Sequence, residues 1–302
     1  MRWDDFRRSD NVEDDRGGGG YSSGGGFGIP GGGIGIGTAI ILGLIGWATG
    51  IDPSILIGGA QIISGGSQYQ QQYRPAPRRT GVPSDRTGQF VAAVLGNTED
   101  TWTEIFASSG RQYRAPRLRL YRGGEQGGCG FAQAAMGPFY CPTDQRIYLD
   151  TSFFRDMQVR FHGCGGKACE FAEAYVIAHE VGHHIQNLLG TLPKAQSAQR
   201  AAGSKAAANR IQVRVEVQAD CLAGVWAHHS DQRWNSIEPG DVEAALQTAA
   251  AIGDDRLQQQ SRGTVVPDSF THGTSAQRQR WFTAGLKAGM LSACDTFAAA
   301  SL

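Results

Sequence analysis

The sequence lacks an excess of charge of either sign, since 28 Lys and Arg residues balance 28 Asp and Glu residues over 302 positions. It also lacks any stretch in which basic and aromatic residues interleave, which is the pattern expected of a nucleic-acid-binding surface. We therefore expect no nucleic-acid partner. The length allows one large domain or two small ones.

Apolar residues are scarce in residues 1–33, which read MRWDDFRRSDNVEDDRGGGGYSSGGGFGIPGGG. The segment is first charged and then rich in glycine. A segment with so little apolar surface to bury is typical of disorder. We expect residues 1–33 to form a disordered tail.

Charge is absent from residues 34–51, IGIGTAIILGLIGWATGI, a run just long enough to cross a bilayer as a helix. The alternatives are a buried core helix or a signal peptide, but a signal peptide places its apolar segment nearer the N-terminus. We expect one transmembrane anchor over residues 34–56. Arg16 precedes the run, and the first basic residue after it is Arg74, a weak bias that puts the N-terminus inside. This predicts a single-pass cell-membrane protein whose main domain is extracytoplasmic, either periplasmic or extracellular.

All six cysteines follow the apolar run, and an even number suits disulfides in an exported domain. Six cysteines allow 15 pairings. Proximity in sequence suggests Cys129–Cys141, Cys164–Cys169 and, for the remaining two, Cys221–Cys294. An alternative use of the middle pair is a small zinc knot with His162.

Polar, Pro-rich sequence follows the anchor, and we expect residues 57–88 to be a linker and residues 89–302 to be a folded domain. APRLRLYR and QRIYLD have the composition of strands. Residues 89–107 favour a helix with a turn in it, and further helices are expected over residues 170–189, 206–229, 240–252 and 275–288. Strands precede helices rather than alternating with them, which indicates the α+β class.

Residues 179–183, HEVGH, form an HExxH pattern within the apolar stretch AYVIAHEVGHHIQNLLG. On a helix, positions i and i+4 lie about 40° apart around the axis, so His179 and His183 can bind one zinc ion. Glu180 lies to the side of that face and can act as a general base toward a water on the metal. His184 points about 140° from His179, and we expect it to contact solvent or to support the site indirectly.

The extended form of this pattern would supply a third histidine six residues after His183, but Leu189 stands there. The best third ligand is Glu216 in VEVQADCLAGVWA. Asp220 lies four residues further on the same helical face and can accept the other ring N–H of a ligand histidine. Weaker alternatives for the third ligand are Asp220 itself, His228, His229 and Asp231.

Hydrolysis of an amide also needs a donor that stabilises the oxyanion. The segment SFTHGTSAQRQRWF offers His272 in a turn and Arg278 in the following helix. We assign both as candidate catalytic residues, against the alternative of ordinary surface polarity.

The segments HEVGHH, VEVQADCLAGVWA and SFTHGTSAQRQRWF together resemble the bacterial neutral zinc metallopeptidase family of single-pass membrane proteins. The resemblance covers nearly the whole chain. It implies a zincin-like fold with a small antiparallel sheet, whose edge strand runs above the metal helix and could pair with a peptide substrate. Residues 145–149 are the candidate for that strand.

A more distant resemblance is to membrane-bound zinc proteases with HExxH, ExxAD and a later His-Pro segment ending in Arg. Residues 216–220, EVQAD, match the second element. His272 and Arg278 match the third, except that Gly273 stands where that group has Pro.

The sequence therefore predicts a membrane-anchored endopeptidase that cleaves a peptide or protein substrate with one Zn²⁺ ion held by His179, His183 and Glu216. Two alternatives stay open. One is a noncatalytic zinc-containing binding or quality-control protein of the cell envelope. The other is a zinc hydrolase acting on a nonpeptide bond, since one site architecture serves many hydrolyses.

Overall fold

The computed structural model describes residues 1–17, 79–133, 137–159, 164 and 168–302. The expected anchor (34–56), most of the expected linker (57–88) and His162 lie outside the described residues. The described residues belong to one compact unit.

The strands and helices of the described residues are, in chain order, β1 (Val12–Asp14), β2 (Arg79–Thr80), α3 (Arg86–Ser108), β3 (Arg117–Tyr121), β4 (Gly124–Gly127), β5 (Gly130–Gln133), β6 (Phe139–Cys141), β7 (Arg146–Asp150), α4 (Ser152–Val159), α5 (Cys169–Leu188), α6 (Thr191–Arg200), α7 (Lys205–Trp234), α8 (Asp241–Ala251), α9 (Asp254–Arg262), η3 (Pro267–Ser269), α10 (Ser275–Ala288) and η4 (Leu291–Cys294).

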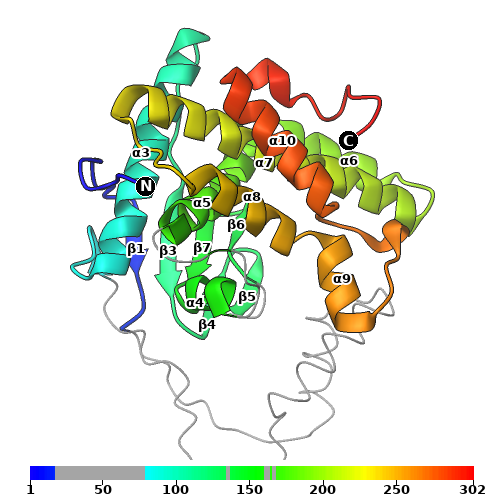
Figure 1. Cartoon of the computed structure of the whole chain (residues 1–302), viewed down its shortest axis with the longest axis horizontal. Helices are drawn as coiled ribbons and strands as arrows, with labels where there is room; N and C mark the ends of the chain where they lie inside the picture. Colours follow the sequence, from blue (N-terminus) through cyan, green and yellow to red (C-terminus); the bar gives the residue numbers. More distant parts are fainter. Residues whose placement is uncertain (18–78, 134–136, 160–163, 165–167) are drawn as a thin grey trace, which may run out of the picture. The chain divides into compact units, whose positions relative to one another are not determined.

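The main sheet has five strands in the order β2-β1-β3-β7-β6, and Figure 1 shows β1, β3, β7 and β6 side by side. The α+β class is confirmed, but the expected antiparallel sheet is mixed. The central strands β1, β3 and β7 run parallel, and β2 and β6 flank them antiparallel. The expected edge strand is also wrong, because β7 is paired on both sides and the edge belongs to β6.

The two faces of this sheet differ in chemistry because side chains alternate along a strand. Val12, Leu118 and Ile147 are register partners, and all are buried in the hydrophobic core that includes residues of α3, α5 and α7. Glu13 and Arg119, on the other face, form a buried ion pair. The apolar face thus fixes α5, the helix with the HExxH pattern, against the sheet.

Residues 1–17 are folded, which corrects this part of the disordered tail expected over residues 1–33, whereas residues 18–33 lie outside the described residues. Met1, Trp3 and Phe6 are at most 6% exposed, and Val12 lies in the sheet between β2 and β3. Composition is misleading here because the few apolar residues of this segment are nearly all buried and several of its charged side chains form ion pairs with residues elsewhere in the chain. Arg7, for example, pairs with Glu99 and Asp100.

The position of β1 also contradicts a single membrane crossing between residues 17 and 79. Asp14 of β1 pairs with Arg79 of β2, so one crossing would put two neighbouring strands on opposite sides of the membrane. Within the described part of the chain, no helix is both long and apolar enough to pass through a bilayer.

The expected helices are confirmed to within a few residues at either end, except that residues 206–229 belong to a longer helix, α7. Helix α3 is continuous and lacks the expected turn. Asp85 caps its N-terminus, and most of its length is buried. The expected linker is too long, since β2 and the start of α3 fall within its last ten residues. Helix α10 packs along α7, as Figure 1 shows.

All three expected disulfides are present: Cys129–Cys141, Cys164–Cys169 and Cys221–Cys294. The alternative zinc knot at Cys164 and Cys169 is therefore wrong, because both thiols are bonded to each other.

Candidate metal and catalytic site

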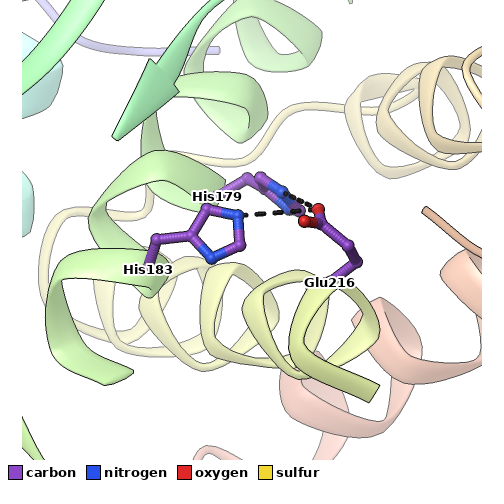
Figure 2. A group of neighbouring side chains, drawn as sticks. All are labelled: His179, His183 and Glu216. Atoms are coloured by element: carbon purple, nitrogen blue, oxygen red, sulfur yellow. Dashed lines mark hydrogen bonds and ion pairs between the residues drawn. The ribbon is translucent and has the colours of Figure 1, made fainter. Parts of the chain in front are cut away.

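Helix α5 directs His179 and His183 toward the same point, as their spacing of four residues predicts. Glu216 of α7 meets them there, and Figure 2 shows the three side chains converging. The distance from Glu216 Oε2 to His179 Nε2 is 3.3 Å, and to His183 Nε2 it is 3.5 Å.

The close approach of α5 and α7 depends on a small residue inside the HExxH pattern. A Cβ on Gly182 would lie 3.0 Å from the carbonyl oxygen of Ala219. Any larger side chain there would push α7 away and withdraw Glu216 from the histidines. This close contact explains why Gly182 and Ala219 are small, although neither side chain takes part in the chemistry.

Asp220 fixes the orientation of His179. Its Oδ1 lies 2.8 Å from His179 Nδ1 and also accepts a 2.6 Å hydrogen bond from the Tyr175 hydroxyl. Arg278 donates to both oxygens of Asp220, from Nε and Nη2, each at 2.8 Å. With the His179 Nδ1–H donated to Asp220, the Nε2 lone pair is free for a metal.

Gln186 performs the same task for His183. Its Oε1 lies 2.9 Å from His183 Nδ1, and its Nε2 donates to the Val215 carbonyl at 2.7 Å and to Gln218 at 3.0 Å. These two bonds fix which end of the buried amide faces the histidine. Glu216 has a partner as well, because Gln212 donates to its Oε1 at 2.7 Å.

The buried charges shift one another's protonation. Burial lowers the pKa of His183, but the charge and hydrogen bond of Glu216, the charge of Glu180 and the hydrogen bond to Gln186 together outweigh burial and raise the pKa to about 9. For Asp220, burial raises the pKa, and the opposing charges of Arg278 and His179 bring it well below its usual range. Burial also raises the pKa of Glu216, but the charge of His183 and the hydrogen bonds of His179 and His183 bring it well below its usual range. Both carboxylates are therefore ionised at neutral pH, as metal ligation and support require.

The cluster fits a zinc ion. Two atoms that are each about 2.0–2.1 Å from a tetrahedral ion are roughly 3.3–3.4 Å apart. The two separations involving Glu216 Oε2 are close to this value, and the three ligand atoms all lie within 4.8 Å of one another. Among the described residues, the cluster of candidate ligands consists of His179, His183 and Glu216. Two imidazoles and a carboxylate are a common donor set for catalytic zinc, which keeps an open position.

A cavity of about 530 Å³ opens beside these ligands. Glu180 lines it, is 6% exposed, and has a buried Oε2 without a hydrogen-bond partner in the described structure. The edge strand β6 forms part of the wall through Phe139 and Tyr140. Further wall residues come from α6, among them Leu192, Ala195 and Gln199.

His272 and Arg278 both reach the cavity, but in different roles. Asp254 accepts the backbone N–H groups of residues 271, 272 and 273 and lies 3.3 Å from His272 Nδ1. Gly273 has a φ of 88°, which proline cannot adopt, and this accounts for its departure from the His-Pro pattern. Arg278 instead donates hydrogen bonds from Nε and Nη2 to Asp220, so it supports His179 rather than a substrate oxyanion.

His184 is fully buried, which rules out the solvent contact considered for it. Its Nδ1 lies 3.0 Å from the Tyr140 hydroxyl and its Nε2 lies 2.6 Å from the Arg114 carbonyl oxygen. Burial lowers the pKa of His184 to about 4, so the neutral ring links α5 to β6. The alternative ligands on α7 are engaged elsewhere, with His228 and His229 facing the carbonyls of Leu286 and Gly289.

Comparison with known proteins identifies the family of this chain. The family described as "Putative neutral zinc metallopeptidase" matches residues 1–297. The chain belongs to this family.

Two relatives of this family member span much of its length. "Uncharacterized protein YpfJ" of Escherichia coli strain K12 is 48% identical over 299 residues, 98% of this chain and 99% of the relative. "Uncharacterized protein Rv2575" of Mycobacterium tuberculosis strain H37Rv is 46% identical over 235 residues, 74% of this chain and 75% of the relative. No solved structure matches the chain.

Several residues of this candidate site were not predicted from the sequence, although their spacing gave a signal. Tyr175 lies four residues before His179, Gln186 three after His183, and Gln212 four before Glu216. Each therefore shares a helical face with the ligand-bearing segment. Asp254 gave no such signal, because it contacts His272 across a turn between separate elements.

Proposed function

We propose that this chain is a zinc-dependent endopeptidase. The observation that carries the proposal is the unpaired buried oxygen of Glu180 on the cavity wall, next to three converging metal-ligand atoms. A buried carboxylate oxygen without a partner is costly, and a place on an open cavity beside a metal site gives it a use.

A zinc ion held by His179, His183 and Glu216 would supply a Lewis acid that polarises a peptide carbonyl and acidifies water. Glu180 would take the proton from the attacking water and pass it to the leaving amine. Burial lowers the pKa of His272, but the hydrogen bond to Asp254 and the charges of Glu216 and Asp254 raise it overall. In its protonated form, His272 would donate from Nε2 toward the developing oxyanion. Asp220 and Arg278 would keep His179 in one tautomer throughout.

A peptide substrate can reach these groups through the wall formed by β6. A sheet edge offers backbone groups that an extended peptide can pair with, and the same strand contributes Phe139 and Tyr140 to the cavity. An extended backbone is thus the substrate shape that the site favours over a compact nonpeptide ester.

The place of action is also proposed. Three disulfides support an oxidising, extracytoplasmic compartment. If the apolar run 34–51 attaches the protein to the membrane, the chain must leave the membrane on the side from which it entered, because β1 and β2 are paired.

The decisive experiment compares full-length protein with its Glu180→Gln variant. The variant should retain zinc while peptide cleavage falls by about 10²–10⁴-fold, the usual contribution of a positioned general base. Zinc content would be measured by metal analysis and cleavage with a peptide library, with chelator-treated protein as the inactive reference. Undiminished cleavage by Glu180→Gln, or cleavage that resists chelator, would refute the proposal.

A further inference from the structure

The two oxygens of Glu216 have different surroundings. Oε2 faces both histidines, and Oε1 accepts a 2.7 Å hydrogen bond from Nε2 of Gln212, one turn earlier on α7. Gln212 is partly buried and lines the cavity. The carboxylate is thus held with one oxygen toward the metal position and the other occupied.

The amide of Gln212 is itself fixed. Its Oε1 accepts a 2.7 Å hydrogen bond from Nε2 of Gln199, which belongs to α6. Since the carbonyl end faces Gln199, the NH₂ end must face Glu216. The chain Gln199–Gln212–Glu216 therefore connects a wall of the cavity to a metal ligand.

A carboxylate can bind a metal through one oxygen or through both. A hydrogen bond to one oxygen competes with the metal for it and favours binding through the other. A catalytic zinc needs a coordination position that protein does not fill. Binding by both oxygens of Glu216 would consume that position.

We propose that Gln212 is a positioning residue that restricts Glu216 to one ligating oxygen, with its own amide orientation set by Gln199. This inference rests on the proposed zinc site but not on peptide cleavage. It also makes α6 more than a passive wall, since a displacement of Gln199 would reach the ligand through a single intervening side chain.

The test uses full-length Gln212→Leu, Gln199→Leu and the matched control Gln196→Leu, an exposed residue of the same cavity wall on α6. Zinc affinity would be measured by competition with a chelator. Loss of an outer hydrogen-bond partner typically costs 10–100-fold in metal affinity, and that loss is expected for Gln212→Leu. A smaller loss is expected for Gln199→Leu and none for Gln196→Leu.

The coordination itself would be followed in protein loaded with Co²⁺, whose visible absorption weakens as coordination number rises. Gln212→Leu should weaken this absorption, and Gln196→Leu should not. If Gln212→Leu fails to fold, Gln212→Met keeps the length of the side chain, removes the donor without adding a charge, and should show the same changes.

The outcomes separate the two proposals. Wild-type protein that binds zinc without cleaving peptides would refute only the endopeptidase. Unchanged zinc affinity and cobalt absorption in Gln212→Leu would refute the role of Gln212, whatever the protein cleaves.

Discussion

Arg278 shows how strongly one buried side chain depends on another. It is 3% exposed at its side chain, and its carboxylate partner Asp220 is 0% exposed. Removing one member of a buried ion pair leaves the other charge without compensation, which costs about 3–5 kcal/mol. We expect Arg278→Met to lower the unfolding free energy of metal-free protein by that amount, measured by urea denaturation.

The matched control is Arg280→Met, two residues further along α10, where the side chain is exposed over Trp281. A surface substitution of this kind should change stability by less than about 0.5 kcal/mol. Equal effects of the two variants would show that the Arg278–Asp220 pair contributes little to stability.

At the residue scale, the sequence was most informative where the chemistry lies within one helix. His179, Glu180 and His183 are related by fixed helical geometry, so their convergence could be predicted. Glu216 lies on a second helix, so helical geometry alone could not bring it to the histidines. It was predicted as the third ligand because it is spaced four residues from Asp220 within an otherwise apolar stretch. The partners that select tautomers, such as Gln186, depend on which end of an amide faces inward, and a sequence does not encode that in any local pattern.

At the scale of elements, strand order was the part that local pattern could not supply. The composition of β3 and β7 predicted strands. Nothing in residues 146–150, however, shows that the three-residue strand β6 pairs with the free edge of β7. β1 was missed for a related reason. Three residues between charged neighbours carry too little signal, and their strand conformation comes from pairing with β2 and β3.

The acid stability of the protein provides a test of β1. Burial raises the pKa of Glu13, but hydrogen bonds from Arg119, Arg146 and Arg117 more than offset it and lower the pKa to about 2 from 4.5. Because the folded-state pKa is the lower one, the stabilisation is complete above about pH 4.5 and is lost as the pH falls toward 2. The size is at most roughly 3 kcal/mol.

Urea denaturation at several pH values between 5 and 3 would measure this effect. Glu13→Gln should flatten the fall in unfolding free energy over that range, whereas Glu243→Gln, at an exposed position of α8, should leave the slope unchanged. A slope that is the same with and without Glu13 would contradict the placement of β1 in the sheet.

At the scale of the whole molecule, the disulfides join distant parts of the chain to different extents. Cys221 of α7 and Cys294 of η4 are 73 residues apart, and Cys164 and Cys169 only 5. The loop-entropy relation gives about 4 kcal/mol for the longer loop and about 2 kcal/mol for the shorter one. The Cys221→Ala/Cys294→Ala pair should therefore lose more stability than the Cys164→Ala/Cys169→Ala pair in denaturant titrations of oxidised, metal-free protein. A larger loss of stability for the Cys164→Ala/Cys169→Ala pair would contradict this prediction.

The pairing of Asp14 with Arg79 has a practical consequence for how this protein can be produced. A shortened gene that starts downstream of the apolar stretch would omit an interior strand of the sheet and uncover the flank of β3. Excising residues 18–78 and bridging the gap with a few flexible residues would keep that strand, because the cut ends are already neighbours. The protein is therefore better trimmed from within than from its front.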